Sequence, residues 1–141
     1  MSRFARLLFG VFFLSLLANG AWAQIVIRKS GSPFLTISQD GTIRERGKKI
    51  GRIESNGSVR KNGSLVGEVE SDGTIRRSGS RLGRVESNGN VRKSGKLIGQ
   101  VSSSGSIRKS GSLWGTSSNC CDDDGRRKVT AAIVFFGEFF D

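Results

Sequence analysis

The sequence predicts an all-β protein: a closed, pseudo-symmetric ring or barrel of short β-hairpins, built from 16-residue repeats around a hydrophobic C-terminal segment. Three observations predict this architecture. Glycine and aliphatic residues recur every 16 residues, and turn-forming pairs punctuate each repeat. An uncharged stretch rich in phenylalanine follows the last repeat. Repeats of this kind bury a continuous core only by packing against one another.

Residues 1–23 have the features of a cleaved signal peptide. Arg3 and Arg6 precede an apolar run over residues 7–18, and Ala21-Trp22-Ala23 supplies small residues before Gln24. The run is shorter than the roughly 20 apolar residues that a membrane-spanning helix needs. We expect export, with the mature chain secreted or held in the periplasm or cell envelope.

The 16-residue period organises residues 24–119, which we predict to form one β-hairpin repeat domain. Three glycine columns start at Gly31, Gly41 and Gly51 and recur at that spacing. Three apolar columns keep the same register. Their members are Ile27, Ile43, Val59, Ile75, Val91 and Ile107; Phe34, Ile50, Val66, Leu82, Ile98 and Trp114; and Ile37, Ile53, Val69, Val85 and Val101.

Each repeat is predicted to hold two short strands separated by tight turns. Asn-Gly, Asp-Gly and Ser-Gly pairs lie between β-branched runs, as at Asn56-Gly57 and Asn62-Gly63. Such pairs favour type I′ hairpin turns, which need positive φ at both central residues. A helix is excluded because each of three glycines per repeat would cost up to about 1 kcal/mol there.

The third glycine column lies inside the second strand of each repeat. Gly67, for example, stands between Val66 and Val69, whose spacing of three would place them on opposite faces of a regular strand. A bulge or bend at the glycine would turn both inward. The first repeat departs from the pattern and carries Leu35 at this position.

The repeats must share one core, because each offers only about three apolar side chains. An open solenoid and a closed ring both achieve this. Solenoids need polar caps at their ends, which the sequence lacks, and closure removes exposed strand edges. We therefore favour the ring. The repeat count stays open between five and six, since the first unit is degenerate and the last truncated.

Residues 120–141 form an acidic turn followed by a hydrophobic segment. Periodicity alone does not distinguish helix from strand here, but Asp122, Asp123 and Asp124 suit a helix N-terminus. A calcium site is the alternative role for these aspartates, although EF-hand spacing is missing. The apolar segment is predicted to fill the centre of the ring; a membrane-inserting or partner-docking tail is the alternative.

The charge balance favours anionic partners. Without residues 1–23 the chain carries 21 Lys and Arg against 12 Asp and Glu, a net charge of +9. Export argues against nucleic acid and for an acidic polysaccharide or an anionic lipid. One arginine recurs in each repeat, and this arginine column is the candidate anion-binding site. Its members are Arg44, Arg60, Arg76, Arg92 and Arg108. Pairing with Glu54, Glu70 and Glu86 is the structural alternative.

No catalytic residue, metal ligand or cofactor is predicted. Histidine is absent, which removes the commonest general base and metal ligand. The adjacent Cys120 and Cys121 lack the spacing of a C-x-x-C motif. A bridge between the two neighbours and pairing with another molecule both remain open.

The repeat pattern and the Ala-Ala-Ile-Val-Phe-Phe run of residues 131–136 resemble the five-fold β-flower proteins. That resemblance implies a shallow barrel of radiating β-hairpins around an apolar centre, comparable to the Tubby C-terminal fold with its central helix. It supplies no catalytic residues. Taken together, the sequence predicts a non-enzymatic structural or binding module of the cell envelope. Binding of a lipid or apolar ligand in the barrel centre, or of a polyanion through the arginine column, is the alternative.

Overall fold

The computed structural model describes residues 24–141, so the predicted signal peptide lies outside the described residues. Twelve strands form one closed antiparallel barrel, and one helix follows them. The strands are β1 (Ile25–Lys29), β2 (Ser32–Ile37), β3 (Thr42–Glu45), β4 (Lys48–Ile53), β5 (Ser58–Lys61), β6 (Ser64–Val69), β7 (Thr74–Arg77), β8 (Ser80–Val85), β9 (Asn90–Lys93), β10 (Lys96–Val101), β11 (Ser106–Lys109) and β12 (Ser112–Ser118).

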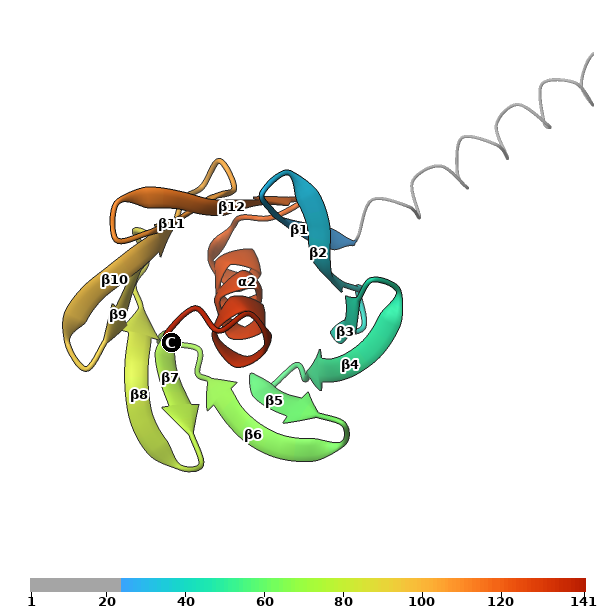
Figure 1. The fold of residues 1–141 in the computed structure, drawn as a ribbon. Helices are drawn as coiled ribbons and strands as arrows, with labels where there is room; N and C mark the ends of the chain where they lie inside the picture. The colour runs from blue at the N-terminus through green and yellow to red at the C-terminus, as the bar shows by residue number, and fades with distance from the viewer. Residues whose placement is uncertain (1–23) are drawn as a thin grey trace, which may run out of the picture.

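Consecutive strands pair into six hairpins, which radiate around the barrel axis (Figure 1). The ring closes where β1 pairs with β12, with Val26 opposite Ser118. The prediction of a closed ring in place of an open solenoid is confirmed. The degenerate first unit and the truncated last unit are both complete hairpins here, so the ring has six of them.

The turn inside each hairpin has the predicted type I′ character. Both residues of the loop have positive φ, for example Asn62 at 50° and Gly63 at 86°. Ser30-Gly31, Arg46-Gly47, Ser78-Gly79, Ser94-Gly95 and Ser110-Gly111 behave alike. Two-residue loops with this twist match the right-handed twist of the flanking strands.

The turns that link one hairpin to the next differ from the prediction. In these links only the glycine has positive φ, as at Gly57 (91°), and its N–H donates to the carbonyl of Glu54 (2.9 Å). This is a type I turn closed by a left-handed glycine. The glycine also accepts a hydrogen bond from Val69 N (3.0 Å). That close approach to the neighbouring strand leaves no room for a side chain and sets the turn type.

A β-bulge lies inside the second strand of each hairpin, directly before the glycine or, in the first hairpin, before Leu35. Val59 pairs with Gly67 and Arg60 with Leu65, so Val66 is the extra residue. Gly67 and Val69 consequently face the interior, while Val66 is half-buried against the core. The predicted irregularity is present, but it lies one residue earlier and turns the glycine, rather than Val66, fully inward.

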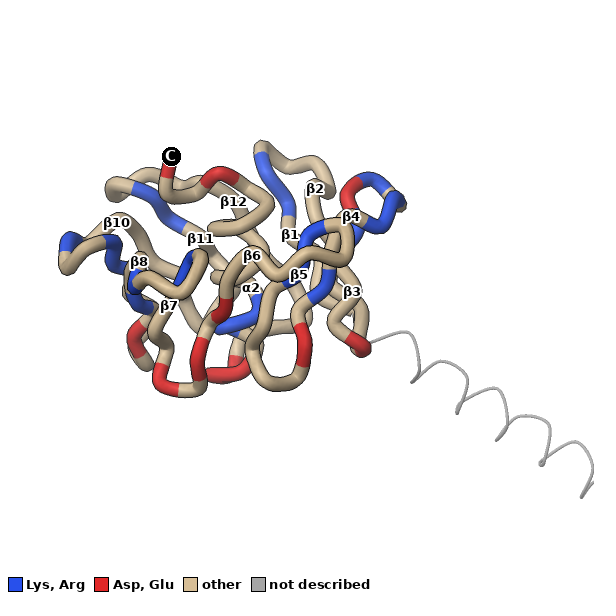
Figure 2. The backbone as a smooth tube through the Cα atoms, turned by 90° about the horizontal axis from the view of Figure 1, so that it is seen from below, with Lys and Arg blue, Asp and Glu red and all other residues tan. Residues whose placement is uncertain are grey.

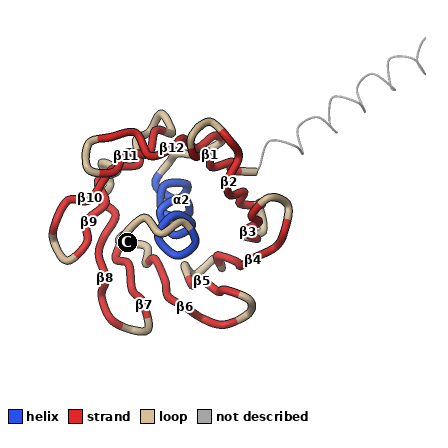
Figure 3. Tube along the Cα trace, in the orientation of Figure 1, coloured by secondary structure: helices blue, strands red, loops and turns tan. Residues whose placement is uncertain are grey.

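Helix α2 (Asp123–Phe136) lies in the centre of the ring (Figures 1 and 3). Asp122 caps its N-terminus and accepts a hydrogen bond from Gly125 N (2.7 Å). Val129 and Ile133 on α2 are fully buried, as is Phe139 beyond its end. The segment is therefore a helix and fills the centre, as predicted. Within the described residues, no helix is long and apolar enough to cross a membrane.

Three of the glycines inside the second strands, Gly51, Gly67 and Gly99, give α2 and the residues after it room to pack. A Cβ added at Gly67 would lie 2.5 Å from the ring of Phe135, and one at Gly99 would lie 2.7 Å from the ring of Phe139. In the first hairpin Leu35 takes this position and is itself fully buried. Hairpin side chains and tail side chains thus share one core.

Candidate functional site

The arginine column lies on the outer surface of the ring. Each arginine follows a fully buried aliphatic residue on the first strand of its hairpin, as Arg60 follows Val59. Because successive side chains alternate between the faces of a strand, each arginine points away from α2. The structure therefore spreads Arg44, Arg60, Arg76, Arg92 and Arg108 around the outside, one on each of the last five hairpins.

Three of these arginines form ion pairs with glutamates of the preceding linking turn. Arg60 pairs with Glu54, Arg76 with Glu70 (2.5 Å) and Arg92 with Glu86 (2.8 Å). The hydrogen bond from Arg92 holds the pKa of Glu86 below its ordinary value. In the same way, the hydrogen bond to Glu70 raises the pKa of Arg76. For Arg60, Arg76 and Arg92 the structure thus has the glutamate pairing that the sequence offered as the alternative to anion binding.

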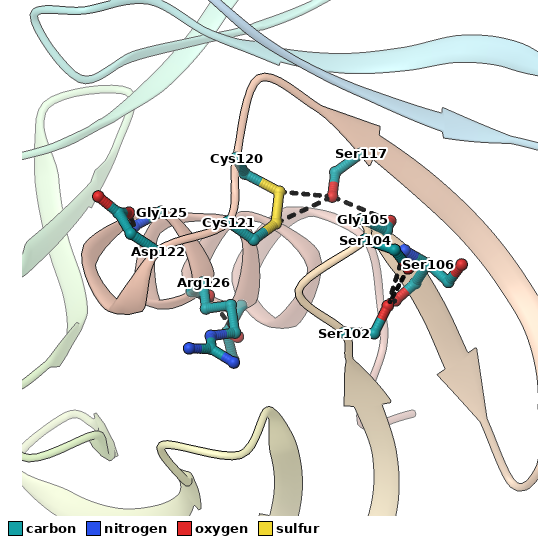
Figure 4. The surroundings of a disulfide bond; sticks show 11 residues. Ser102, Ser104, Gly105, Ser106, Ser117, Cys120, Cys121, Asp122, Gly125 and Arg126 are labelled. Atoms are coloured by element: carbon teal, nitrogen blue, oxygen red, sulfur yellow. Dashed lines mark hydrogen bonds between the residues drawn. A yellow bond between two sulfur atoms is a disulfide. The ribbon is translucent and has the colours of Figure 1, made fainter.

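Arg44 and Arg108 form no ion pair with any residue that the structure describes. The positions that hold glutamate in the other hairpins hold Ser38 and Ser102 here. Ser102 Oγ instead lies 2.8 Å from Ser104 Oγ and accepts a hydrogen bond from Ser106 N (3.1 Å; Figure 4). Arg44 Nη1 is buried and lacks a hydrogen-bond partner. Arg108 is exposed.

Grooves separate neighbouring hairpins and bring the arginines next to half-buried apolar residues. They lie between β4 and β5 (about 300 Å³), β8 and β9 (about 450 Å³), and β10 and β11 (about 360 Å³). Each is lined by one member of the arginine column, by the bulge residue of the preceding strand and by a two-residue hairpin turn. The bulge residues are Ile50, Leu82 and Ile98.

The walls of the three grooves differ. Lys49 and Arg52 line the β4–β5 groove, and Arg81 and Arg84 line the β8–β9 groove. The corresponding residues of the β10–β11 groove are Leu97 and Gln100. Two grooves are thus strongly cationic, and the third combines an apolar residue, a neutral amide and Arg108.

Charge is segregated along the barrel axis (Figure 2). Most carboxylates lie in the linking turns and at the N-terminus of α2, at one end of the ring. They are Asp40, Glu54, Glu70, Asp72, Glu86, Asp122, Asp123 and Asp124. The hairpins, which extend from the other end, carry most of the lysines and arginines. The hairpin half is therefore the cationic part of the described chain.

A second basic column faces the centre of the ring, and sequence reasoning missed its role. Each member comes directly after an arginine of the arginine column, and its side chain therefore lies on the same inner face of the strand as the buried aliphatic residue two positions earlier. Lys61 lies over Phe136, Arg77 over Phe135, Lys93 over Phe140 and Lys109 over Phe139, each cation 5.7–6.0 Å from the ring centroid. Cations at this distance attract the ring faces. The regular spacing beside a phenylalanine-rich tail was the available signal.

Cys120 and Cys121 are joined by a disulfide beside the start of α2 (Figure 4). Ser117 Oγ lies 2.9 Å from Cys120 Sγ and donates to Gly105 O (3.1 Å). The bridge between neighbours, one of the two predicted alternatives, is the one present. Residues 24–141 hold no cluster of three or more His, Cys, Asp or Glu side chains suited to a metal ion.

Comparison of the chain with protein-family models, curated proteins and solved structures found no match.

Proposed function

We propose that the protein is an exported, non-enzymatic binding module of the cell envelope, whose hairpin half binds an anionic polymer or anionic lipid headgroups. The observation that carries this proposal is that two members of the arginine column, Arg44 and Arg108, have no carboxylate partner among the described residues and lie on the cationic half of the ring. Guanidinium groups form charge-assisted, often bidentate, bonds with phosphate and carboxylate.

Charge segregation strengthens this proposal. Acidic residues at the far end leave the potential of the hairpin half positive, which attracts anions and raises their rate of association. A closed ring with its centre filled by α2 also fits membership in the β-flower family, with six hairpins in place of five. Both points support a surface-binding module.

The test is salt-dependent binding of the mature chain, residues 24–141, to heparin and to vesicles containing anionic lipid. The double variant Arg44→Gln/Arg108→Gln is expected to elute from heparin at clearly lower salt than the wild type. The matched control, Arg60→Gln/Arg92→Gln, removes the same charge from glutamate-paired positions and should shift elution less. Wild-type protein that fails to bind either matrix at low salt would refute the proposal.

Binding of an apolar ligand in the barrel centre has less support. Val129, Ala132 and Ile133 of α2 are fully buried there, so the tail occupies the space that such a ligand would need. Native mass spectrometry of the purified mature chain tests this alternative. A stoichiometric bound lipid that disappears on substitution of Ile133 would favour it over surface binding.

Export is part of the proposal and rests on the pattern of residues 1–23. We expect the protein recovered from the periplasm or medium to begin at Gln24. N-terminal sequencing of that fraction checks the cleavage point. An intact Met1 on the exported protein would contradict the assignment of a signal peptide.

A further inference from the structure

The groove between β10 and β11 differs in chemistry from the β4–β5 and β8–β9 grooves. We propose that it binds a single-chain anionic amphiphile, such as an alkyl phosphate or a fatty acid. Arg108 would hold the acidic group, and Leu97 and Ile98 would contact the first part of the hydrocarbon chain. This inference rests on the proposed function and names the class of ligand at one part of the same surface.

Three members of the arginine column line these grooves, and Arg108 is the one among them without an ion pair. Arg60 and Arg92 each pair with a glutamate, and each also donates from Nη1 to the carbonyl of its hairpin-turn glycine, Gly63 or Gly95 (3.3 Å). Arg108 makes neither interaction with the described residues. Its five N–H donors are therefore free to bind an incoming acid.

Ser102 explains this difference. It takes the position of Glu54, Glu70 and Glu86 but bonds within its own turn, to Ser104 and Ser106. A single residue change in one linking turn thus releases the arginine of the following hairpin. Ser110, which also lines the groove, supplies a hydroxyl beside Arg108 that can donate to the same acid.

The rest of the groove is suited to hydrocarbon. Leu97 is 51% exposed, and Ile98 is half-buried against the core. The corresponding residues to Leu97 are Lys49 and Arg81 in the other grooves. The volume of about 360 Å³ falls within the roughly 300–1,000 Å³ typical of small-ligand sites. Burying part of a chain on Leu97 removes exposed apolar surface from water.

One acidic group fits this groove better than a polyanion does. Gln100 is neutral where the β8–β9 groove has Arg84, and Asn90 is also neutral, so Arg108 is the one charged residue among those that line the site. A polymer with many acidic groups would gain more from the arginine-rich β4–β5 and β8–β9 grooves. The β10–β11 groove therefore selects for a single charge with an attached chain.

The test is calorimetric titration of the mature chain with dodecyl phosphate below its micellar concentration. Inorganic phosphate and dodecyl maltoside serve as probes for the headgroup alone and the chain alone. Ser102→Glu introduces the carboxylate that Glu54, Glu70 and Glu86 supply in three other linking turns, and it is expected to weaken dodecyl phosphate binding at least tenfold. Arg108→Gln should do the same, and the matched Arg92→Gln should leave binding within twofold. Both single-part probes should bind far more weakly than dodecyl phosphate.

Several results would overturn the inference. They are unchanged binding in both Ser102→Glu and Arg108→Gln, equal loss in Arg92→Gln, or inorganic phosphate binding as tightly as dodecyl phosphate. Thermal unfolding by circular dichroism confirms that each variant is folded. Wild-type protein that binds heparin or anionic vesicles but not dodecyl phosphate would refute this inference alone. Failure to bind heparin and vesicles would refute the proposed function instead.

Discussion

At the scale of single residues, the absence of a side chain shapes the core. Gly67 faces the ring of Phe135 and also approaches the carbonyl of Arg76 on the next hairpin. A side chain at this position would collide with both the central helix α2 and the neighbouring strand. Leu35, in the first hairpin, shows the other solution, since it fills the equivalent space itself. Packing at native density leaves little room for change at either position.

Gly67→Ala is expected to lower the free energy of unfolding by roughly 1–3 kcal/mol, the usual effect of overpacking. The Cβ would lie 2.5 Å from the Phe135 ring, so the helix or the strand must move. Urea denaturation of the mature chain measures the change. Ser64→Ala, at an exposed position on the same strand, is the control. Equal stability of the two variants would contradict the packing described for this glycine.

Acid stability depends on single carboxylates in the linking turns. Asp40 and Asp72 accept hydrogen bonds from Thr42 N (3.0 Å) and Thr74 N (2.9 Å), which lower the pKa of both carboxyls below 3.8. A lowered folded-state pKa stabilises the fold above the ordinary value, and that contribution disappears as the pH falls below it. Protonation of these two aspartates in acid therefore lowers the stability of the folded protein.

In the variant Asp40→Asn/Asp72→Asn, the loss of Tm below pH 3.8 should be smaller than in the wild type, with Tm near neutral pH preserved. Asn56 and Asn88 make the same turn contact in neighbouring links, which shows that asparagine is accepted. Differential scanning calorimetry across the acid range measures this. A parallel acid dependence of the two proteins would mean that other carboxylates dominate.

At the scale of elements, the C-terminal segment is held by the second basic column of the hairpins. Lys93 Nζ donates to Phe140 O (2.9 Å) and Lys109 Nζ to Asp141 O (2.9 Å). The same ammonium groups lie over the rings of Phe140 and Phe139. Two hairpins, β9–β10 and β11–β12, thereby fix the tail after α2 through residues more than 30 positions earlier in the sequence.

Lys93→Met/Lys109→Met is expected to speed amide hydrogen exchange at residues 139–141 and to lower stability by about 0.5–1 kcal/mol for each lost cation–aromatic contact. Lys96→Met, on the same hairpin as Lys93 but exposed, is the control for lost charge. If all three substitutions give the same exchange rates, the ammonium groups do not hold the tail.

At the scale of the whole molecule, ring closure and the central helix depend on each other. Each hairpin contributes few buried side chains, such as Val59 and Val69 in the third, too few to fold alone. Helix α2 supplies apolar surface to the hairpins around it, and β1–β12 pairing removes the last free edges. Neither part has a complete core without the other.

Truncation after Asn119 is expected to abolish cooperative unfolding and to produce aggregated protein, because the inner faces of the hairpins would be exposed to water. Size-exclusion chromatography and thermal unfolding measure the outcome. A full-length variant with Phe139→Ala controls for removal of one buried side chain and should remain folded, with stability reduced by roughly 3–5 kcal/mol. A monomeric, equally stable truncated protein would refute the shared core.

The sequence could predict much of the fold because its information is local and repeated. Glycine spacing, turn pairs and aliphatic columns recur along the repeats, so the ring and its hairpin turns follow from them, and the aspartates before the apolar tail indicate the helix. The linking turns were predicted with the wrong type, because their conformation depends on the contact between Gly57 and Val69 of the following strand pair. The bulge was misplaced by one residue for a similar reason: pairing register decides it.

For the candidate site too, some features follow from the sequence and others only from the tertiary structure. By itself the sequence determined which residues recur: an arginine in each hairpin, a basic neighbour beside it, and a phenylalanine-rich tail. Only the tertiary structure decided their partners. It paired Arg60, Arg76 and Arg92 with glutamates, left Arg108 facing a groove, and set the second basic column over the aromatic rings. The reason is physical: turn and strand preferences act between neighbours, whereas ion pairs, grooves and ring contacts arise between segments that meet only when the barrel closes.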